Sequence, residues 1–162
     1  LETVDLTHVY MPIFDEQSIY TTVKKVFHTQ GVDTLIVDYF KGGDDTDAFA
    51  TYQSLGGLVD MVKNHLAGSM NIAAIGAAQA TSGEKLADSA KIARNASTII
   101  LLKDKTPEEI AADGVECGNK KLIVKFNRNG PQHSSGEYID MWFDGDIVSY
   151  EEAKQHIPIT PY

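Results

Sequence analysis

An acidic residue that follows a short apolar run is the first candidate for metal chemistry in this chain. Thr34 to Val37 is apolar on both faces and rich in branched side chains, which is typical of strands inside a parallel sheet. Asp38 follows directly. Nucleotide-hydrolysing domains hold magnesium with a carboxylate at the end of such a strand. The pattern fits two interpretations equally, because Asp38 can also cap a loop.

Two further sites carry residue types suited to phosphate chemistry. Gln79 follows a second buried run, Asn71 to Ala78, and a neutral amide there can bond a terminal phosphate or its attacking water. Lys125 and Arg128 precede the turn sequence Asn129-Gly130-Pro131, from which a cation can reach a phosphate on a neighbouring subunit. Taken singly, these residues are also compatible with a loop amide and with surface charges.

The elements that would position these residues alternate along the chain. Helices are predicted after the capping residue Asp15, ending near Gly31, then from Tyr52 to Leu66 and from about Glu84 to Asn95. Strands are predicted at Val4 to Met11, Thr34 to Val37, Asn71 to Ala78 and Ser97 to Leu102. This alternation predicts a parallel sheet with flanking helices and ligands beyond the carboxyl ends of its strands. We therefore expect Asp38 and Gln79 at one edge.

The later part of the chain has a different pattern. Lys121 to Phe126 and Glu137 to Phe143 alternate as strands do, and the Asn-Gly-Pro sequence between them predicts an antiparallel hairpin. We expect the tail from Glu151 to Tyr162 to form a short helix and an extended end. The predicted fold is α/β, with one incomplete domain over residues 1–150 and a tail over 151–162. Because the chain opens on Leu1, we expect it to begin within a domain.

Composition narrows the classes of function. The chain has 162 residues, of which 43% are hydrophobic, enough for one domain with a core. A net charge of -9 argues against a lysine-coated surface for nonspecific nucleic-acid binding. The sequence shows neither a membrane-spanning run nor a charged-then-apolar leader, so we expect no membrane partner. The single cysteine, Cys117, cannot form an internal disulfide, so we expect a reducing cytoplasm.

Taken in order, these segments resemble the later part of the RecA-like motor domain of DnaB-type replicative helicases. Leu35 to Tyr39 is similar to that family's Walker B strand, and Ile75 to Gln79 to its phosphate-sensing strand. Leu86 to Ile92 resembles its DNA loop, and Arg128 to Pro131 the hairpin that carries its intersubunit arginine finger. The resemblance runs from about Thr7 to Tyr150, and the ordered set is more specific than any one segment.

The resemblance implies ATP and Mg²⁺ as cofactors and assigns roles to residues. Asp38 would hold magnesium, and Gln79 would contact the terminal phosphate. Arg128, with Lys125 nearby, would face the neighbouring subunit's nucleotide, and Tyr150 would lie beside the adenine. Contacts to single-stranded DNA would come from Lys85, Asp88, Ser89, Ala90 and Lys91. The family works as a hexamer that translocates on one strand and unwinds duplex during replication, so a primase or helicase loader is an expected partner.

Several positions depart from the family pattern. Ala87 stands where the DNA loop usually has arginine, and Ala90 where it has glycine. DNA contact would therefore fall to backbone amides or to Lys85 and Lys91. Phe126 occupies the place, two before the finger arginine, where the family usually has lysine. These departures indicate a divergent relative, such as one encoded by a phage.

The sequence also lacks a glycine-rich phosphate loop of the GxxxxGK type, and the family's catalytic glutamate lies upstream of the segments matched. Since that loop supplies most of the grip on nucleotide, we expect these residues alone not to hydrolyse ATP. Two alternatives stay open: a RecA-like recombinase-type ATPase, or a noncatalytic partner of a helicase ring. The Asn-Gly-Pro hairpin favours the helicase.

Overall fold

The structure is a computed structural model that describes residues 5–40, 55–78, 92 and 94–156. The chain divides into two compact units, a first unit from Leu1 to Ala96 and a second from Ser97 to Tyr162, and each is described by itself. The fold is mixed α/β, with a parallel sheet in the first unit and an antiparallel sheet in the second. No helix among the described residues has the length and apolar character needed to cross a bilayer.

The first unit opens with a helix that the sequence predicts well. Helix α1 spans Glu16–Gln30, and Asp15 caps it by accepting a hydrogen bond from the Ser18 amide at 2.7 Å. The helix ends at Gly31, as predicted from the glycine. Ile19, on its apolar stripe, is buried in the core.

Strands β1 (Thr34–Phe40) and β2 (Ala73–Ala78) form the sheet of this unit. They pair in parallel, with Thr34 opposite Ala73 and Phe40 opposite Ala78, which confirms the predicted direction. Between them lie a π-helix, η1 (Met61–Ala67), preceded by helical residues 55–60, and a short turn of helix, α3 (Gly68–Met70).

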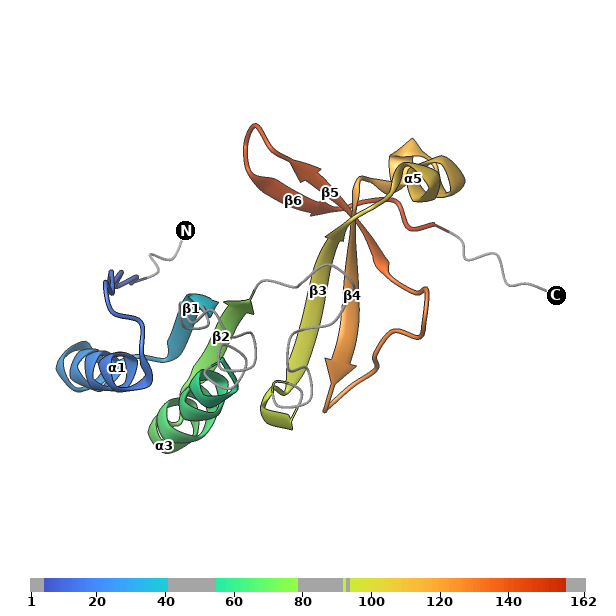
Figure 1. The fold of residues 1–162 in the computed structure, drawn as a ribbon. Coiled ribbons are helices and arrows are strands. Elements are labelled where there is room, and N and C mark those ends of the chain that lie inside the picture. The colour runs from blue at the N-terminus through green and yellow to red at the C-terminus, as the bar shows by residue number, and fades with distance from the viewer. Residues whose placement is uncertain (1–4, 41–54, 79–91, 93, 157–162) are drawn as a thin grey trace, which may run out of the picture. The chain divides into compact units, whose positions relative to one another are not determined.

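The helices and the sheet of the first unit enclose one apolar core. Figure 1 shows α1 and the second helical segment beside the β1–β2 sheet. The buried members of the core are Ile19, Val37, Leu58, Met61, Val62 and Leu66. In contrast, Ile36 is 61% exposed and Ile75 60% exposed. The described helices therefore leave apolar side chains of both strands open to solvent.

The second unit is an antiparallel sheet in the order β3-β4-β5-β6. Its strands are β3 (Thr98–Asp104), β4 (Lys120–Asn127), β5 (Ile139–Asp144) and β6 (Ser149–Glu152). Helix α5 (Pro107–Asp113) and the 3-10 turn η2 (Val115–Cys117) connect β3 to β4. A capping box between Thr106 and Glu109, with Pro107 in the first turn, starts α5.

Gly118 ends this connection and lets two backbones meet. Its φ of +77° lies in the left-handed region, and an added Cβ would lie 2.3 Å from the Met141 carbonyl oxygen. A side chain at this position would therefore be strained and would also clash with β5. The close approach brings the end of η2 against the strand that carries Asp140.

Three predicted elements differ in the structure. The predicted strand at Val4 to Met11 has no regular secondary structure over residues 5–11, because a strand requires a hydrogen-bonded neighbour. The expected third parallel strand, β3, instead pairs antiparallel with β4. An apolar run predicts a buried strand, but it does not show whether the neighbouring strand runs parallel or antiparallel. The predicted tail helix is absent from the described part of the tail, since Glu151 and Glu152 lie in β6 and residues 153–156 are not helical.

The two strands of the predicted hairpin are antiparallel, but no tight turn joins them. β4 and β5 are antiparallel, and they pair only over Lys120–Leu122 and Ile139–Met141. Residues 128–138 therefore form a long connection, not a tight turn. The fully paired neighbour of β4 is β3.

Candidate functional site

Asp38 lies in β1, near the carboxyl end of the parallel pair. It is exposed, whereas the preceding residue, Val37, is buried in the core. The last residue of β2, Ala78, pairs with Phe40, so both strands finish at one edge. Among the residues that the structure describes, none hydrogen-bonds to the Asp38 carboxylate. The carboxylate is a hard oxygen donor of the kind that Mg²⁺ prefers.

Several predicted site residues lie outside the described part of the chain. Gln79 comes directly after Ala78, the last described residue of β2. The predicted DNA contacts also fall in the segment 79–91, namely Lys85, Asp88, Ser89, Ala90 and Lys91. Their assignments stay predictions.

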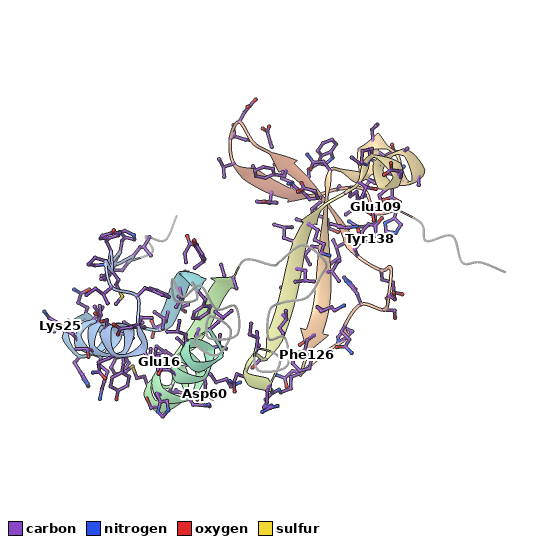
Figure 2. The ribbon with its side chains drawn as sticks, viewed as in Figure 1. Glu16, Lys25, Asp60, Glu109, Phe126 and Tyr138 are labelled. Atoms are coloured by element: carbon purple, nitrogen blue, oxygen red, sulfur yellow. The ribbon has the colours of Figure 1, made fainter. Side chains whose placement is uncertain are left out.

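Lys125 and Arg128 lie at the end of β4 that is far from α5. Lys125 is an exposed residue of the strand, and Arg128 is the first residue of the turn that follows it. Figure 2 places Phe126, between them, at the opposite end of the second unit from Glu109 and Tyr138. The Arg128 amide donates a hydrogen bond to the Ser97 carbonyl at 2.8 Å, so the backbone of this residue is fixed.

Tyr150 lies in β6 opposite Phe143 of β5. The two ring centroids are 4.5 Å apart, and the Lys120 ammonium lies 5.1 Å from the Phe143 centroid. Tyr150 keeps 45% of its surface exposed. An exposed ring backed by a second ring and a cation is suited to stacking against a planar base.

A buried ionic cluster in the second unit was not foreseen from the sequence. Lys105, directly after β3, has a side chain with no solvent exposure. Its ammonium donates to Asp113 Oδ2 at 2.8 Å, to the Cys117 carbonyl at 3.0 Å and to Asp140 Oδ1. All three protons of the ammonium therefore have acceptors.

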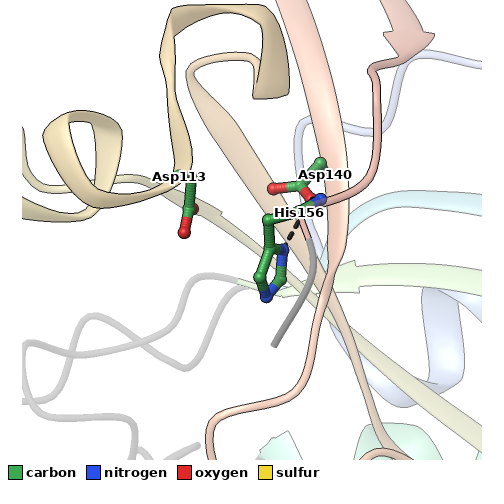
Figure 3. A group of neighbouring side chains, drawn as sticks. All are labelled: Asp113, Asp140 and His156. Atoms are coloured by element: carbon green, nitrogen blue, oxygen red, sulfur yellow. Dashed lines mark hydrogen bonds and ion pairs between the residues drawn. The ribbon is translucent and has the colours of Figure 1, made fainter. Parts of the chain in front are cut away.

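The remaining members of the cluster tie the tail to the sheet. The His156 amide donates to Asp140 Oδ2, and His156 Nδ1 lies 2.6 Å from the same oxygen (Figure 3). Tyr138 donates its hydroxyl to Asp113 at 2.7 Å and stacks on the His156 ring. Gln155 both accepts from the Asp140 amide and donates to its carbonyl. These bonds hold residues 153–156 against the sheet, and none of these residues is helical.

The charges of the cluster shift one another's pKa. Burial alone would raise the pKa of Asp140 and of Asp113. The hydrogen bonds from Lys105, together with those from His156 to Asp140 and from Tyr138 to Asp113, outweigh burial and hold both pKa values below the ordinary value. Burial likewise opposes the charge on Lys105, and its bonds to the two carboxylates raise its pKa nonetheless. Burial and then the bond to Asp113 raise the pKa of Tyr138. The ion pairs are therefore charged at neutral pH.

The arrangement suits a structural role better than metal binding. Asp113, Asp140 and His156 each offer a ligand atom, and these atoms lie within 4.8 Å of one another. Lys105 already bonds both carboxylates, so a cation would have to displace a fixed ammonium. Within the described residues no buried side-chain polar atom lacks a partner. The cluster thus joins α5, β5 and the tail.

We expect the second unit to lose stability in acid because of these carboxylates. Since the folded pKa of Asp113 and Asp140 is lowered, their contribution is full above the unfolded value, about 4, and is lost as pH falls through the folded values. Denaturation followed by the fluorescence of Trp142, the single tryptophan, should show a falling midpoint below about pH 4. Asp113→Asn should flatten this dependence. Glu151→Gln, on the exposed edge strand, should leave it unchanged, and equal slopes in both variants would contradict the assignment.

The chain was also compared with known proteins. No protein-family model matches it. No curated protein sequence matches it either. The functional conclusion therefore depends on the residues and their geometry.

Sequence reasoning missed the cluster for a physical reason. Asp113 lies 8 residues after Lys105 and Asp140 lies 35 residues after it, and no spacing rule links the three. One signal was readable: Asp140 interrupts an otherwise apolar strand, Ile139 to Phe143, and a charged residue inside a strand pattern requires a partner.

Proposed function

We propose that this chain is the later part of the ATP-driven motor of a hexameric replicative DNA helicase, which translocates on single-stranded DNA and unwinds duplex. The observation that carries the proposal is the parallel pairing of β1 and β2, which brings Asp38 to the edge where β2 ends. Ligands of open parallel sheets bind beyond this edge. The order of the motifs along the chain selects this motor over other nucleotide-binding domains.

The roles of the residues follow from that edge. Asp38 would hold Mg²⁺, since its carboxylate is exposed and adjoins a buried strand residue. Gln79 would bond the terminal phosphate. When bound, the metal neutralises the charge that develops on the transferred phosphoryl group. The protein would work in the cytoplasm on single-stranded DNA, as a ring that takes a primase or a loader as partner.

Arg128 would act on the neighbouring subunit's nucleotide. It is an exposed arginine at the start of a turn whose backbone is anchored to the second unit. A guanidinium presented in this way can stabilise transferred phosphoryl charge across a subunit boundary. Tyr150 would stack on the base of the nucleotide, and Lys125 would add positive charge near the finger.

Replacing Asp38 with asparagine in the full-length protein tests the proposal. We expect Mg²⁺-dependent ATP turnover to fall about 100-fold or more, because the loss of a metal carboxylate removes several kcal/mol of transition-state stabilisation. Binding of a fluorescent nucleotide without Mg²⁺ should change little.

The matched control is Asp33→Asn. Asp33 immediately precedes β1, so it lies at the opposite end of the same strand, and it is also exposed. Its replacement should leave turnover within about twofold, as is usual for surface substitutions. Equal turnover in Asp38→Asn and Asp33→Asn would refute the magnesium role and with it the motor.

A further inference from the structure

We propose that Asn127 is a positioning residue, whose side-chain amide fixes the turn that presents Arg128. The functional importance of this turn rests on the proposed function, while the ordering of the turn does not. Asn127 is the last residue of β4 and immediately precedes Arg128.

The amide of Asn127 bonds both sides of the turn. Its Oδ1 accepts a hydrogen bond from the Asn129 backbone amide at 3.3 Å. Its Nδ2 donates to the Pro131 carbonyl at 3.2 Å. One planar group therefore spans the turn from its second residue to its fourth, with Arg128 held inside the loop that these bonds close.

The same amide connects the turn to the neighbouring strand. Thr98 Oγ1 donates to Asn127 Oδ1 at 3.4 Å, and Thr98 is the residue opposite Asn127 in the β3–β4 ladder. The Arg128 amide in turn donates to the Ser97 carbonyl. The Arg128 amide and the Asn127 side chain thus tie the turn to the start of β3.

Packing leaves little freedom in the turn. A Cβ added to Gly130 would lie 2.7 Å from Asn127 Nδ2, so the glycine backbone closes directly over the amide. Farther along, the His133 amide donates to the Val124 carbonyl at 3.0 Å, and the Val124 amide donates to His133 Nδ1 at 3.1 Å. This pair holds the returning segment against β4.

Asparagine is the residue type that satisfies this geometry. Aspartate has the same shape and can accept from Asn129, but it cannot donate to Pro131. Alanine can do neither. A series of these three side chains therefore separates the donor function from the acceptor function and from simple volume.

Hydrogen exchange of the chain tests the ordering of the turn directly. In Asn127→Ala we expect the Asn129 amide to exchange about two- to tenfold faster, as the loss of one hydrogen bond requires. Amides in the middle of β4 should be unchanged. Asn127→Asp should leave the Asn129 amide protected, since its acceptor remains. Unchanged exchange of the Asn129 amide in Asn127→Ala would overturn the proposal.

Kinetic measurements on the full-length protein test whether the ordered turn around Arg128 is needed for ATP turnover. Asn127→Ala should lower kcat about 10- to 100-fold, the effect of misplacing a reacting group, with nucleotide affinity within about twofold. In an Arg128→Ala background the same change should have no further effect on kcat. A further loss in that background would refute positioning through Arg128.

The two proposals fail in different ways. If Arg128→Ala alone leaves turnover intact, the finger role is wrong, and the exchange result still decides whether Asn127 orders the turn. Thr98→Val is the matched control, because it removes only the longest of the three contacts to the amide. It should change kcat less than Asn127→Ala does, and an equal loss would contradict the central role of the amide.

Discussion

Replacing Lys105 with alanine should lower the free energy of unfolding of the second unit by about 3–5 kcal/mol, the cost of removing one partner from a buried ion pair. Asp140 has no solvent-exposed side-chain surface, and the Lys105 ammonium pairs with its carboxylate. Without the ammonium, a buried carboxylate loses its counter-charge and the Cys117 carbonyl loses a donor. Urea unfolding followed by Trp142 fluorescence would measure the change.

An exposed lysine of the same unit provides the control. Lys154 pairs with Glu116 at 3.4 Å, and both side chains are more than half exposed. Its replacement by alanine should cost at most about 1 kcal/mol, as is usual for surface ion pairs. If Lys105→Ala cost no more than Lys154→Ala, the cluster would not be what joins α5, β5 and the tail.

Replacing Arg128 with alanine in the full-length protein should lower ATP turnover by about 10³-fold or more, which is the range measured for intersubunit arginine fingers. Nucleotide binding should stay nearly intact, because the proposed finger would act on the developing transition state. Steady-state turnover and equilibrium binding of a fluorescent nucleotide would measure the two effects. Loss of binding would refute an intersubunit role. Lys154→Ala, in the same unit, should change neither quantity.

Mixed rings provide the sharper test of a finger that acts in trans. Asp38→Asn subunits lack the proposed metal carboxylate but keep Arg128, and Arg128→Ala subunits have the reverse defect. A subunit boundary that combines Asp38 from an Arg128→Ala subunit with Arg128 from an Asp38→Asn subunit should be active. We expect mixtures to exceed the turnover of either variant alone. Mixtures that stay as inactive as the separate variants would place the arginine and the carboxylate within one subunit's site.

The predicted elements agree with the structure where local signals are strong. The cap at Asp15, the apolar stripe of α1 and the glycine at its end lie close together in sequence, and each acts within a few residues. The branched residues of β1 and the small apolar run of β2 also mark their strands. The parallel direction of that pair followed from the helical segment between the strands.

The structure differs from the sequence prediction where a pairing partner distant in sequence determines the secondary structure. The sequence predicts that Glu151 and Glu152 start a helix, but they pair with β5 and belong to the sheet. Residues 5–11 have an apolar pattern and no neighbouring strand among the described residues, so they stay irregular. β3 has the composition of a buried parallel strand, and its partner β4 makes it antiparallel.

The sequence by itself determined α1, the strand character of β1 and β2, and the order of the candidate motifs, because caps, stripes and breakers act between near neighbours. It also predicted a strand that ends at Val37 with Asp38 directly after it, whereas β1 continues to Phe40 and contains Asp38. Only the tertiary structure decided which charges meet, since Lys105, Asp113 and Asp140 come together through the sheet and α5. It also decided that the Asn127 amide closes the turn around Arg128. Burial makes such contacts strong, and burial is a property of the folded chain, not of any short segment.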